Sequence, residues 1–140
     1  MAGTITTSTI QNDTSSPPTF RNNSVEIGTL CRAWVNFNGT GTSSVIRASF
    51  NVSSVTDNGT ADYTVNFANA ISDANYAVNC SISSDNNGTV ADTGGINIAI
   101  NTNLVATSLV APTTTAFRMT FTWPTSGRPN PTYVNVSVFR

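Results

Sequence analysis

Three consecutive segments between Leu30 and Tyr76 carry an apolar side chain at every second position, and this alternation constrains the fold more than any other feature. The apolar positions are Cys31, Ala33, Val35 and Phe37, then Ile46, Ala48, Phe50 and Val52, then Tyr63, Val65 and Phe67. Successive side chains of a strand point to opposite faces, and the residues between these positions are mostly polar. The segments therefore predict antiparallel strands that share one buried face.

The joints around these segments carry turn residues. Asn38-Gly39 follows the first segment, and Asn58-Gly59 precedes the third. Asparagine and glycine adopt the positive φ angles of tight reversals, at which a β-branched residue is strained. The spacing therefore predicts a chain reversal at each dipeptide.

The remaining chain predicts further short strands. Residues 68–75 break the alternation and predict a loop. The alternation returns at Tyr76, Val78, Cys80 and Ile82, at Ile96, Ile98 and Ile100, at Phe117, Met119, Phe121 and Trp123, and at Val134, Val136 and Val138. Another strand is expected within residues 104–111. About seven or eight short strands separated by turn signals are typical of two packed sheets, so residues 30–140 predict an all-β antiparallel β-sandwich.

Residues 1–29 predict an extended N-terminal arm. They lack sustained periodicity, and Pro17-Pro18 has no backbone N–H groups to donate to a strand ladder. Apolar side chains are nevertheless spread along the arm, and Ile5, Ile10 and Phe20 are candidate contacts. Such arms either stay mobile or lie along a neighbour, and we expect this one to pack on another subunit or another protein.

Most polar side chains are uncharged. The chain has 18 asparagine, 23 threonine and 16 serine residues, six arginines and seven acidic residues, and neither lysine nor histidine. Because there is no basic field to hold phosphates, nucleic-acid binding is not expected. No stretch approaches the roughly 20 apolar residues of a membrane helix. The first residues lack the basic and apolar regions of a secretory signal, so we expect assembly in a cytoplasm.

Cys31 and Cys80 alternate with other core-facing positions. The favoured interpretation is two buried, reduced thiols, because free cysteine behaves as a small buried apolar residue. A disulfide between neighbouring strands is the alternative.

The residue types leave few routes to catalysis. Without histidine, the usual serine and cysteine arrangements with a histidine base cannot form. The carboxylates that could form a catalytic pair are Asp57, Asp62, Asp73, Asp85 and Asp92. Turn positions and the exposed side of a strand account for three of them, and the turns at 57–58 and 85–87 have too few oxygen ligands for a dedicated calcium loop. We therefore expect no enzymatic activity, no metal and no other cofactor.

Four sequence words lie within residues 33–78. They are AWVNFNGTG at 33–41, IRASFNVSS at 46–54, DNGTADYTVNF at 57–67 and DANYAV at 73–78. These words resemble a module of structural proteins of tailed bacteriophages, cyanophages among them, that are usually described as tail fibre or tail proteins. The resemblance is strongest over residues 31–80 and weaker at YVNVSVFR, residues 133–140.

The resemblance implies a non-enzymatic virion structural protein. It implies a tail fibre, tail tip or baseplate-attached component that forms a homotrimer, contacts other virion proteins and leaves distal loops for the host surface. In this interpretation residues 1–29 anchor the domain. A capsid decoration protein that stabilises the head shell is the alternative, because a small neutral sandwich with an arm would serve equally. A carbohydrate-binding module is the third hypothesis.

Two residues of the first strand are candidate subunit or virion contacts. Arg32 and Trp34 alternate with the core-facing positions and therefore point away from the predicted core. An outward tryptophan is typical of a contact with a partner.

A second group of candidates surrounds the predicted loop 124–131. Trp123, Arg128, Asn130 and Tyr133 lie close together in sequence. Aromatic rings stack on sugar faces and polar side chains reach sugar hydroxyls, so these residues are candidate contacts for a host surface glycan. Trp123 also ends a core-facing series, and burial in the core is its alternative interpretation.

Overall fold

The structure of the protein is a computed structural model that describes residues 20–22, 25–28, 30–41, 44–83, 85–86, 97–103, 108–124 and 127–140. These residues form strands and loops, and no helix occurs among them. The chain divides into two compact units, Met1–Leu30 and Cys31–Arg140.

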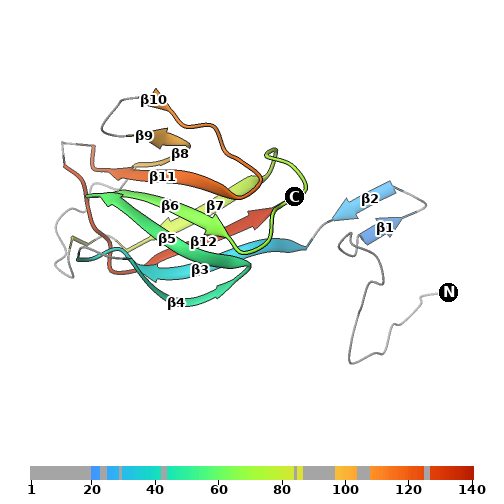
Figure 1. The fold of residues 1–140 in the computed structure, drawn as a ribbon, viewed down its shortest axis with the longest axis horizontal. Helices are drawn as coiled ribbons and strands as arrows, with labels where there is room; N and C mark the ends of the chain where they lie inside the picture. The colour runs from blue at the N-terminus through green and yellow to red at the C-terminus, as the bar shows by residue number, and fades with distance from the viewer. Residues whose placement is uncertain are drawn as a thin grey trace. The chain divides into compact units, whose positions relative to one another are not determined.

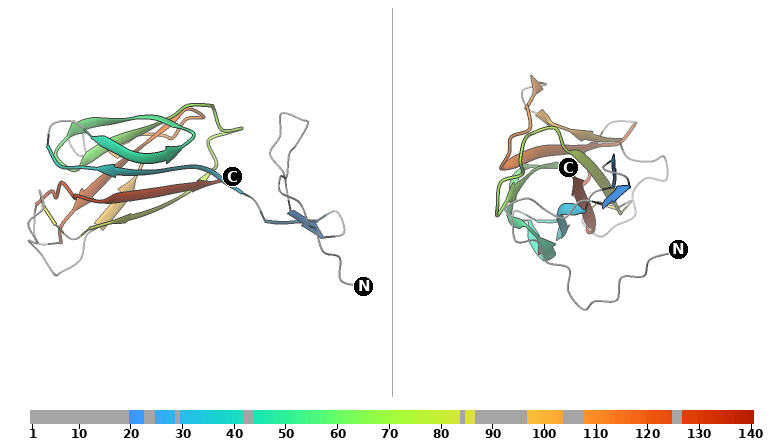
Figure 2. Two further views of the ribbon diagram at one scale, coloured as in Figure 1. Left: turned by 90° about the horizontal axis from the view of Figure 1, so that it is seen from below. Right: turned by 90° about the vertical axis from the view of Figure 1, so that its right-hand side faces the viewer.

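The unit Cys31–Arg140 is a β-sandwich of two antiparallel four-stranded sheets (Figures 1 and 2). One sheet has the order β4-β3-β12-β7 and consists of Val45–Phe50, Cys31–Asn38, Val134–Phe139 and Ala77–Ile82. The other has the order β5-β6-β11-β8 and consists of Val52–Gly59, Asp62–Phe67, Ala116–Thr122 and Asn97–Ile100. The all-β antiparallel sandwich predicted from the alternation is confirmed.

Regular pairing also occurs in the unit Met1–Leu30. Strands β1 (Phe20–Asn22) and β2 (Val25–Gly28) pair antiparallel, with Asn22 opposite Val25. The alternation did not predict this hairpin, because such short strands are too brief to show a period. Of the predicted arm contacts, Phe20 begins β1, and Ile5 and Ile10 lie outside the described residues.

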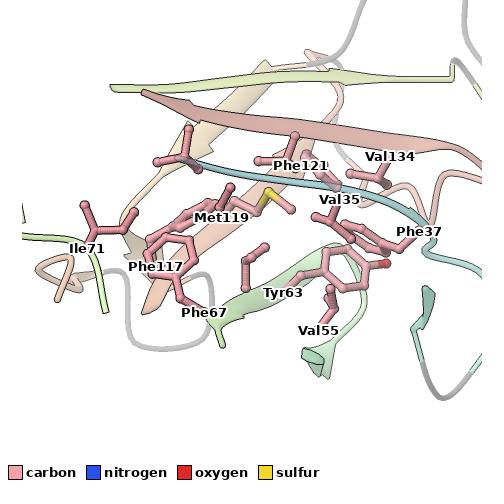
Figure 3. Packing of buried hydrophobic residues seen from close by; sticks show 14 of the residues in the cluster. Val35, Phe37, Val55, Tyr63, Phe67, Ile71, Phe117, Met119, Phe121 and Val134 are labelled. Carbon is pink, nitrogen blue, oxygen red and sulfur yellow. The ribbon is translucent and has the colours of Figure 1, made fainter. Parts of the chain in front are cut away.

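The core fills the space between the two sheets (Figure 3). Its largest contribution comes from the predicted alternating positions of four strands, namely Ala33, Val35, Phe37, Tyr63, Val65, Phe67, Phe117, Met119, Phe121, Val134, Val136 and Val138. The Phe37 and Tyr63 rings meet edge to face with their centroids 5.3 Å apart. Such a contact stabilises by about 0.5–1.5 kcal/mol beyond burial. The inward sides of β3, β6, β11 and β12 therefore hold the sandwich together.

The second alternating segment, residues 46–52, is divided between the two sheets. Strand β4 ends at Phe50 and β5 begins at Val52, because Asn51 between them adopts a positive φ of 53°. Its side-chain amide donates to Arg32 O at 3.1 Å and its Oδ1 accepts from Asn69 N at 2.8 Å. Asn51 therefore fixes the point at which the chain passes from one sheet to the other.

The prediction that Ala48 and Phe50 face the core is wrong. The register places Asn36 opposite Ala48 and Phe37 opposite Ile46, so Arg47 is an extra residue in β4. A bulge of this kind interrupts the alternation. Ile46 consequently packs against the core, whereas Ala48 and Phe50 are exposed.

Only one of the two predicted Asn-Gly reversals uses positive φ at its glycine. Strands β5 and β6 reverse with φ of 130° at Gly59 and 61° at Ala61. After the other dipeptide β3 and β4 reverse as predicted, but neither Asn38 nor Gly39 has a positive φ, which falls instead at Gly41 with 87°. Gly39 is required for space instead, because an added Cβ would lie 2.9 Å from both Pro131 O and Tyr63 Oη.

The strands between residues 97 and 109 are shorter than predicted. The strand expected around residues 93–102 is β8, Asn97–Ile100, and it is followed by β9, Thr102–Asn103. The strand expected within 104–111 is β10, Ser108–Leu109, which pairs with β9. Ile96 and residues 104–107 lie outside the described residues.

The two cysteines are free and lie on strands that are not neighbours. Cys31 is in β3 and Cys80 is in β7, and β12 lies between these strands. Two strand spacings separate them by roughly 9–10 Å, which exceeds the Cα separation of a disulfide. Both side chains are only half-buried, so full burial, as predicted, is not observed.

Candidate functional site

The outer side of the β4-β3-β12-β7 sheet carries two large exposed rings. Trp34 lies directly opposite Phe50 across β3 and β4, and their exposed fractions are 40% and 54%. We call this surface the Trp34 face and define it by the outward positions Trp34, Asn36, Ala48, Phe50, Asn79, Ser81, Asn135 and Ser137. None of these side chains carries a charge.

The Trp34 face is uneven. Its β3 and β4 half carries the two rings, whereas its β7 and β12 half has small polar side chains. A shallow depression of about 320 Å³ lies over the latter half and is lined by Asn79, Cys80, Ser81, Asn135, Val136 and Ser137. Within the face, Asn36 Nδ2 donates to Asn135 Oδ1. The face thus combines an apolar ridge with a neighbouring polar hollow.

The outer side of the β5-β6-β11-β8 sheet has a different character. We call it the Arg118 face and define it by Ser54, Thr56, Asn58, Asp62, Thr64, Asn66 and Arg118. Arg118 Nε and Nη2 donate to the two carboxylate oxygens of Asp62, each at 2.7 Å. Asp62 lies on the outward side of β6, as predicted, but it is only 2% exposed because this ion pair covers it.

Loops of both sheets meet at the end where β3, β5, β7 and β11 finish and β4, β6 and β12 begin. Asn130 connects them, since its Oδ1 accepts from Ala61 N at 2.8 Å and its backbone N donates to Asn86 Oδ1 at 3.1 Å. Tyr63 Oη lies 2.8 Å from Gly39 O and 3.0 Å from Asn130 Oδ1, and its single proton serves either acceptor. Asn130 is therefore held in place from two sides.

Asp85 fixes the segment that follows Asn130. Its carboxylate accepts from Thr132 N at 3.1 Å and also from the Thr132 and Ser83 hydroxyls. Asp85 is buried, and its hydrogen bonds explain why a carboxylate is tolerated there. This residue has a structural role at the loop end, where it bonds to a distant segment at Thr132, whereas the sequence predicted a bond to the backbone of its own turn.

A pocket of about 430 Å³ opens among these loops. Its lining residues are Gly41, Asp57, Asn58, Gly59, Thr60 and Asn130. We call it the loop-end pocket. The chain enters the sandwich at Cys31, opposite Phe139 of β12, so the connection to residues 1–30 is made at the other end of the sandwich.

The structure separates the four candidate glycan contacts. Asn130 lines the loop-end pocket, whereas Trp123, Arg128 and Tyr133 are not among its lining residues. Trp123 is half-buried, and its backbone N donates to Gly127 O at 3.2 Å. Tyr133 directly precedes β12 of the β4-β3-β12-β7 sheet, and its ring is exposed. The Arg47 guanidinium lies 4.3 Å from the centroid of this ring.

The candidate subunit contacts are also placed. Trp34 is exposed on the Trp34 face, and Arg32, two residues earlier in β3, is half-buried. Phe50, which completes the apolar ridge, was assigned to the core from its alternation. The bulge at Arg47 could not be recognised in the sequence, so nothing there indicated that Phe50 faces outward beside Trp34.

The sequence predicts only part of the pocket. Asp57-Asn58 is recognisable as an oxygen-rich turn and Asn130 as a polar loop residue, but no sequence pattern indicates that they lie close together. Gly41 and Thr60 were not singled out. The turn signal at residues 57–60 was visible, whereas the approach of residue 130 to this turn depends on the folded chain.

The titratable side chains with the largest shifts are held in their neutral forms. Burial raises the pKa of the Cys80 thiol to about 12. Burial, helped by the nearby charges of Asp57 and Asp62, raises the pKa of the Tyr63 hydroxyl well above its ordinary value of 10.0. At neutral pH Tyr63 is therefore a hydrogen-bond donor, and Cys80 is a poor nucleophile.

Among the described residues no three His, Cys, Asp or Glu side chains gather as they would around a metal ion. The described part of the chain also contains no helix long and apolar enough to cross a membrane. Comparisons with protein-family models, with curated protein sequences and with solved structures find no match to this chain.

Proposed function

We propose that this chain is a non-enzymatic structural protein of a bacteriophage virion, a tail fibre, tail tip or baseplate-attached component, and that it forms a homotrimer through the Trp34 face. The exposed pair of Trp34 and Phe50 carries the proposal. Adjacent large rings on a neutral sheet face are typical of a surface that another protein covers. The side chains that define the face carry no charge, and the Arg47 guanidinium of the same sheet lies over the exposed Tyr133 ring.

The size of the apolar ridge bears on how the assembly is held. With exposed fractions of 40% and 54%, covering both rings would bury roughly 200 Å², which stabilises by on the order of 5 kcal/mol. Association costs an estimated 4–15 kcal/mol of lost freedom. The rings alone do not hold a stable complex, so the proposal requires further contacts from the Trp34 face and from residues 1–29.

The resemblance to tail proteins supports the virion setting. The word AWVNFNGTG contains Trp34 and the word IRASFNVSS contains Phe50, so both rings of the ridge lie within the resembling sequence. The virion location and the trimer are implied by this resemblance. The ridge supplies a physical basis for subunit contact.

The order of elements supports anchoring through residues 1–29. These residues connect to the sandwich at Cys31, and the loop-end pocket lies at the opposite end. An anchor at one end leaves the loops at the other end free for the environment. Deleting residues 1–25 is expected to leave a folded sandwich and to prevent incorporation into particles; normal incorporation of this variant would remove the anchoring role.

The oligomer is tested by light scattering on the full-length recombinant protein. We expect the mass of a trimer, and a smaller species when Trp34→Ser and Phe50→Ser are combined. Leu109→Ser is the matched control, because Leu109 of β10 is 85% exposed and lies outside the Trp34 face. An unchanged trimer in the double variant would contradict the assignment of the interface.

The virion location is tested by immunogold labelling of particles purified from infected cells. Label on tails is the expected result. Label on heads, together with a monomeric free protein that binds purified capsids, would replace the tail assignment with capsid decoration.

A further inference from the structure

We infer that the loop-end pocket is a binding site for a neutral sugar. This inference goes beyond virion assembly and uses no residue of the Trp34 face. The pocket volume of about 430 Å³ lies within the range of roughly 300–1,000 Å³ that is usual for small-molecule sites. The described residues of its lining are two glycines, one threonine, two asparagines and one aspartate, and none of these has a large apolar side chain. The pocket therefore selects a polar ligand.

Three side chains of the pocket keep one polar atom unused. Asp57 Oδ1 accepts from Gly59 N at 2.8 Å, and Asp57 Oδ2 has no hydrogen-bond partner among the described residues. Asn58 Nδ2 donates to Thr64 Oγ1 at 2.9 Å, and Asn58 Oδ1 likewise has no hydrogen-bond partner among the described residues. Asn130 Oδ1 accepts from Ala61 N, and Asn130 Nδ2 remains available.

These unused atoms match the chemistry of sugar hydroxyls. A hydroxyl both donates and accepts, and the pocket provides acceptors at Asp57 and Asn58 and a donor at Asn130. The other polar atom of each of these side chains is already bonded within the protein, so the available atoms are fixed before a ligand arrives. Fixed groups bind with a smaller loss of conformational entropy.

Other ligand classes fit the pocket less well. An anion would meet the carboxylate of Asp57, and Arg118 is already paired with Asp62 outside the pocket lining. A calcium ion takes six to eight oxygen ligands. Here the engaged oxygens of Asp57 and Asn130 leave too few side-chain oxygens for that number.

The expected affinity is weak. Among the described residues of the lining no aromatic ring stacks on a sugar face, so a single site should bind in roughly the millimolar range. Several copies in one assembly would raise the apparent affinity for a polymeric glycan, because the later binding events become intramolecular.

The test is saturation-transfer NMR on the full-length protein, with D-glucose, D-galactose, D-mannose and N-acetyl-D-glucosamine as probes. Two isosteric variants change only the unused atoms. Asp57→Asn keeps an acceptor for Gly59 N and converts the second oxygen into a donor. Asn130→Asp keeps the acceptor for Ala61 N and converts the donor into an oxygen.

Matched controls make the same chemical changes at the opposite end of the sandwich. Asp73→Asn and Asn75→Asp alter residues of the loop before β7, far from the pocket lining. Thermal unfolding of all four variants checks that each is folded. The combined Trp34→Ser and Phe50→Ser variant checks that sugar binding is independent of assembly, so that failure of the proposed oligomer and failure of the pocket are distinguishable.

We expect saturation transfer to at least one probe, reduced at least threefold in Asp57→Asn and in Asn130→Asp and unchanged in both controls. Transfer that is equal in wild type and in both pocket variants would overturn the inference, as would no transfer to any probe at 20 mM. A response of the pocket to calcium chloride alone, lost in Asp57→Asn and accompanied by no sugar signal, would replace the sugar site with a cation site.

Discussion

The two outer faces of the sandwich differ in how far their outward side chains bond to one another. On the Arg118 face, polar side chains bond to one another: Asn66 Nδ2 donates to Ser54 Oγ and Thr56 Oγ1, each at 3.0 Å, and Arg118 covers Asp62. On the Trp34 face, Trp34 and Phe50 stand exposed beside a shallow polar hollow. Polar side chains of the first surface bond to one another, whereas the second surface leaves apolar area exposed to water.

Strand alternation alone therefore does not show whether an outward face is exposed to solvent or covered by a partner. Both faces derive from the outward positions of antiparallel strands, and both are rich in Asn, Ser and Thr. They differ because cross-strand partners on one face complete each other's hydrogen bonds, while two aromatic residues meet across β3 and β4 on the other. A face that keeps large apolar side chains exposed is suited to an external partner.

The largest effect on this comparison is expected from removing the buried ion pair. Asp62→Ala leaves the Arg118 guanidinium, whose side chain is only 17% exposed, without its carboxylate. We expect the free energy of unfolding, measured with urea, to fall by about 3 kcal/mol. Asp73→Ala, which breaks the exposed pair with Arg140, is the control and should produce no measurable change. Equal losses in both variants would refute the role of burial.

Alkaline pH should destabilise the interior of the sandwich, which the two sheets share. Burial raises the pKa of Cys80 from 9.0 to about 12 and that of Tyr76 from 10.0 to about 12. The unfolded chain therefore loses these protons at a lower pH than the folded chain, so stability falls as the pH rises above about 9. Each group contributes at most about 1.4 kcal/mol per pH unit.

Urea unfolding at several pH values between 8 and 11 measures this loss. In Cys80→Ala the free energy of unfolding should fall less steeply between pH 9 and 10. The reason is that tyrosines of the unfolded chain ionise at a higher pH than the thiol, with ordinary pKa values of 10.0 and 9.0. An identical slope in Cys80→Ala would show that the thiol is not the group responsible.

A smaller effect should distinguish the amides of the two faces. Asn66→Ala removes the hydrogen bonds to Ser54 and Thr56 on the Arg118 face and should lower the free energy of unfolding by about 1 kcal/mol. Asn135→Ala on the Trp34 face removes only the exposed bond with Asn36 and should have less effect. Both are measured by urea unfolding, and a greater loss in Asn135→Ala would reverse the comparison.

The smallest effect is expected from removing the exposed tryptophan. Trp34→Ser in dilute, monomeric protein should lower the free energy of unfolding by about 0.2–1 kcal/mol, because the ring faces away from the core and acts mainly through its cross-strand contact with Phe50. The same variant should weaken association measured by light scattering. A large loss of monomer stability would mean that Trp34 supports its own sheet and not a partner.

The strands could be predicted from the sequence because alternation survives wherever a strand is regular. Phe117, Met119 and Phe121 of one sheet are all buried as expected, and so are Val134, Val136 and Val138 of the other. The prediction failed where the backbone departs from regularity. The extra residue Arg47 turned Phe50 outward, and the positive φ of Asn51 divided one predicted strand into two.

The candidate sites were less predictable, because each joins residues that are distant in the chain. Asn130 reaches the turn at residues 57–60 through its bond to Ala61, and Asp62 is buried because Arg118 from β11 covers it. No local sequence pattern predicts that the residues of either contact lie close together.

The all-β class, the strand positions of the core and the scarcity of charge follow from local periodicity and composition, so they could be predicted before folding is considered. Which polar groups are satisfied and which surface stays open depends on the folded chain. Cross-strand register and loop packing depend on the whole chain, and they separate the Arg118 face, the Trp34 face and the loop-end pocket.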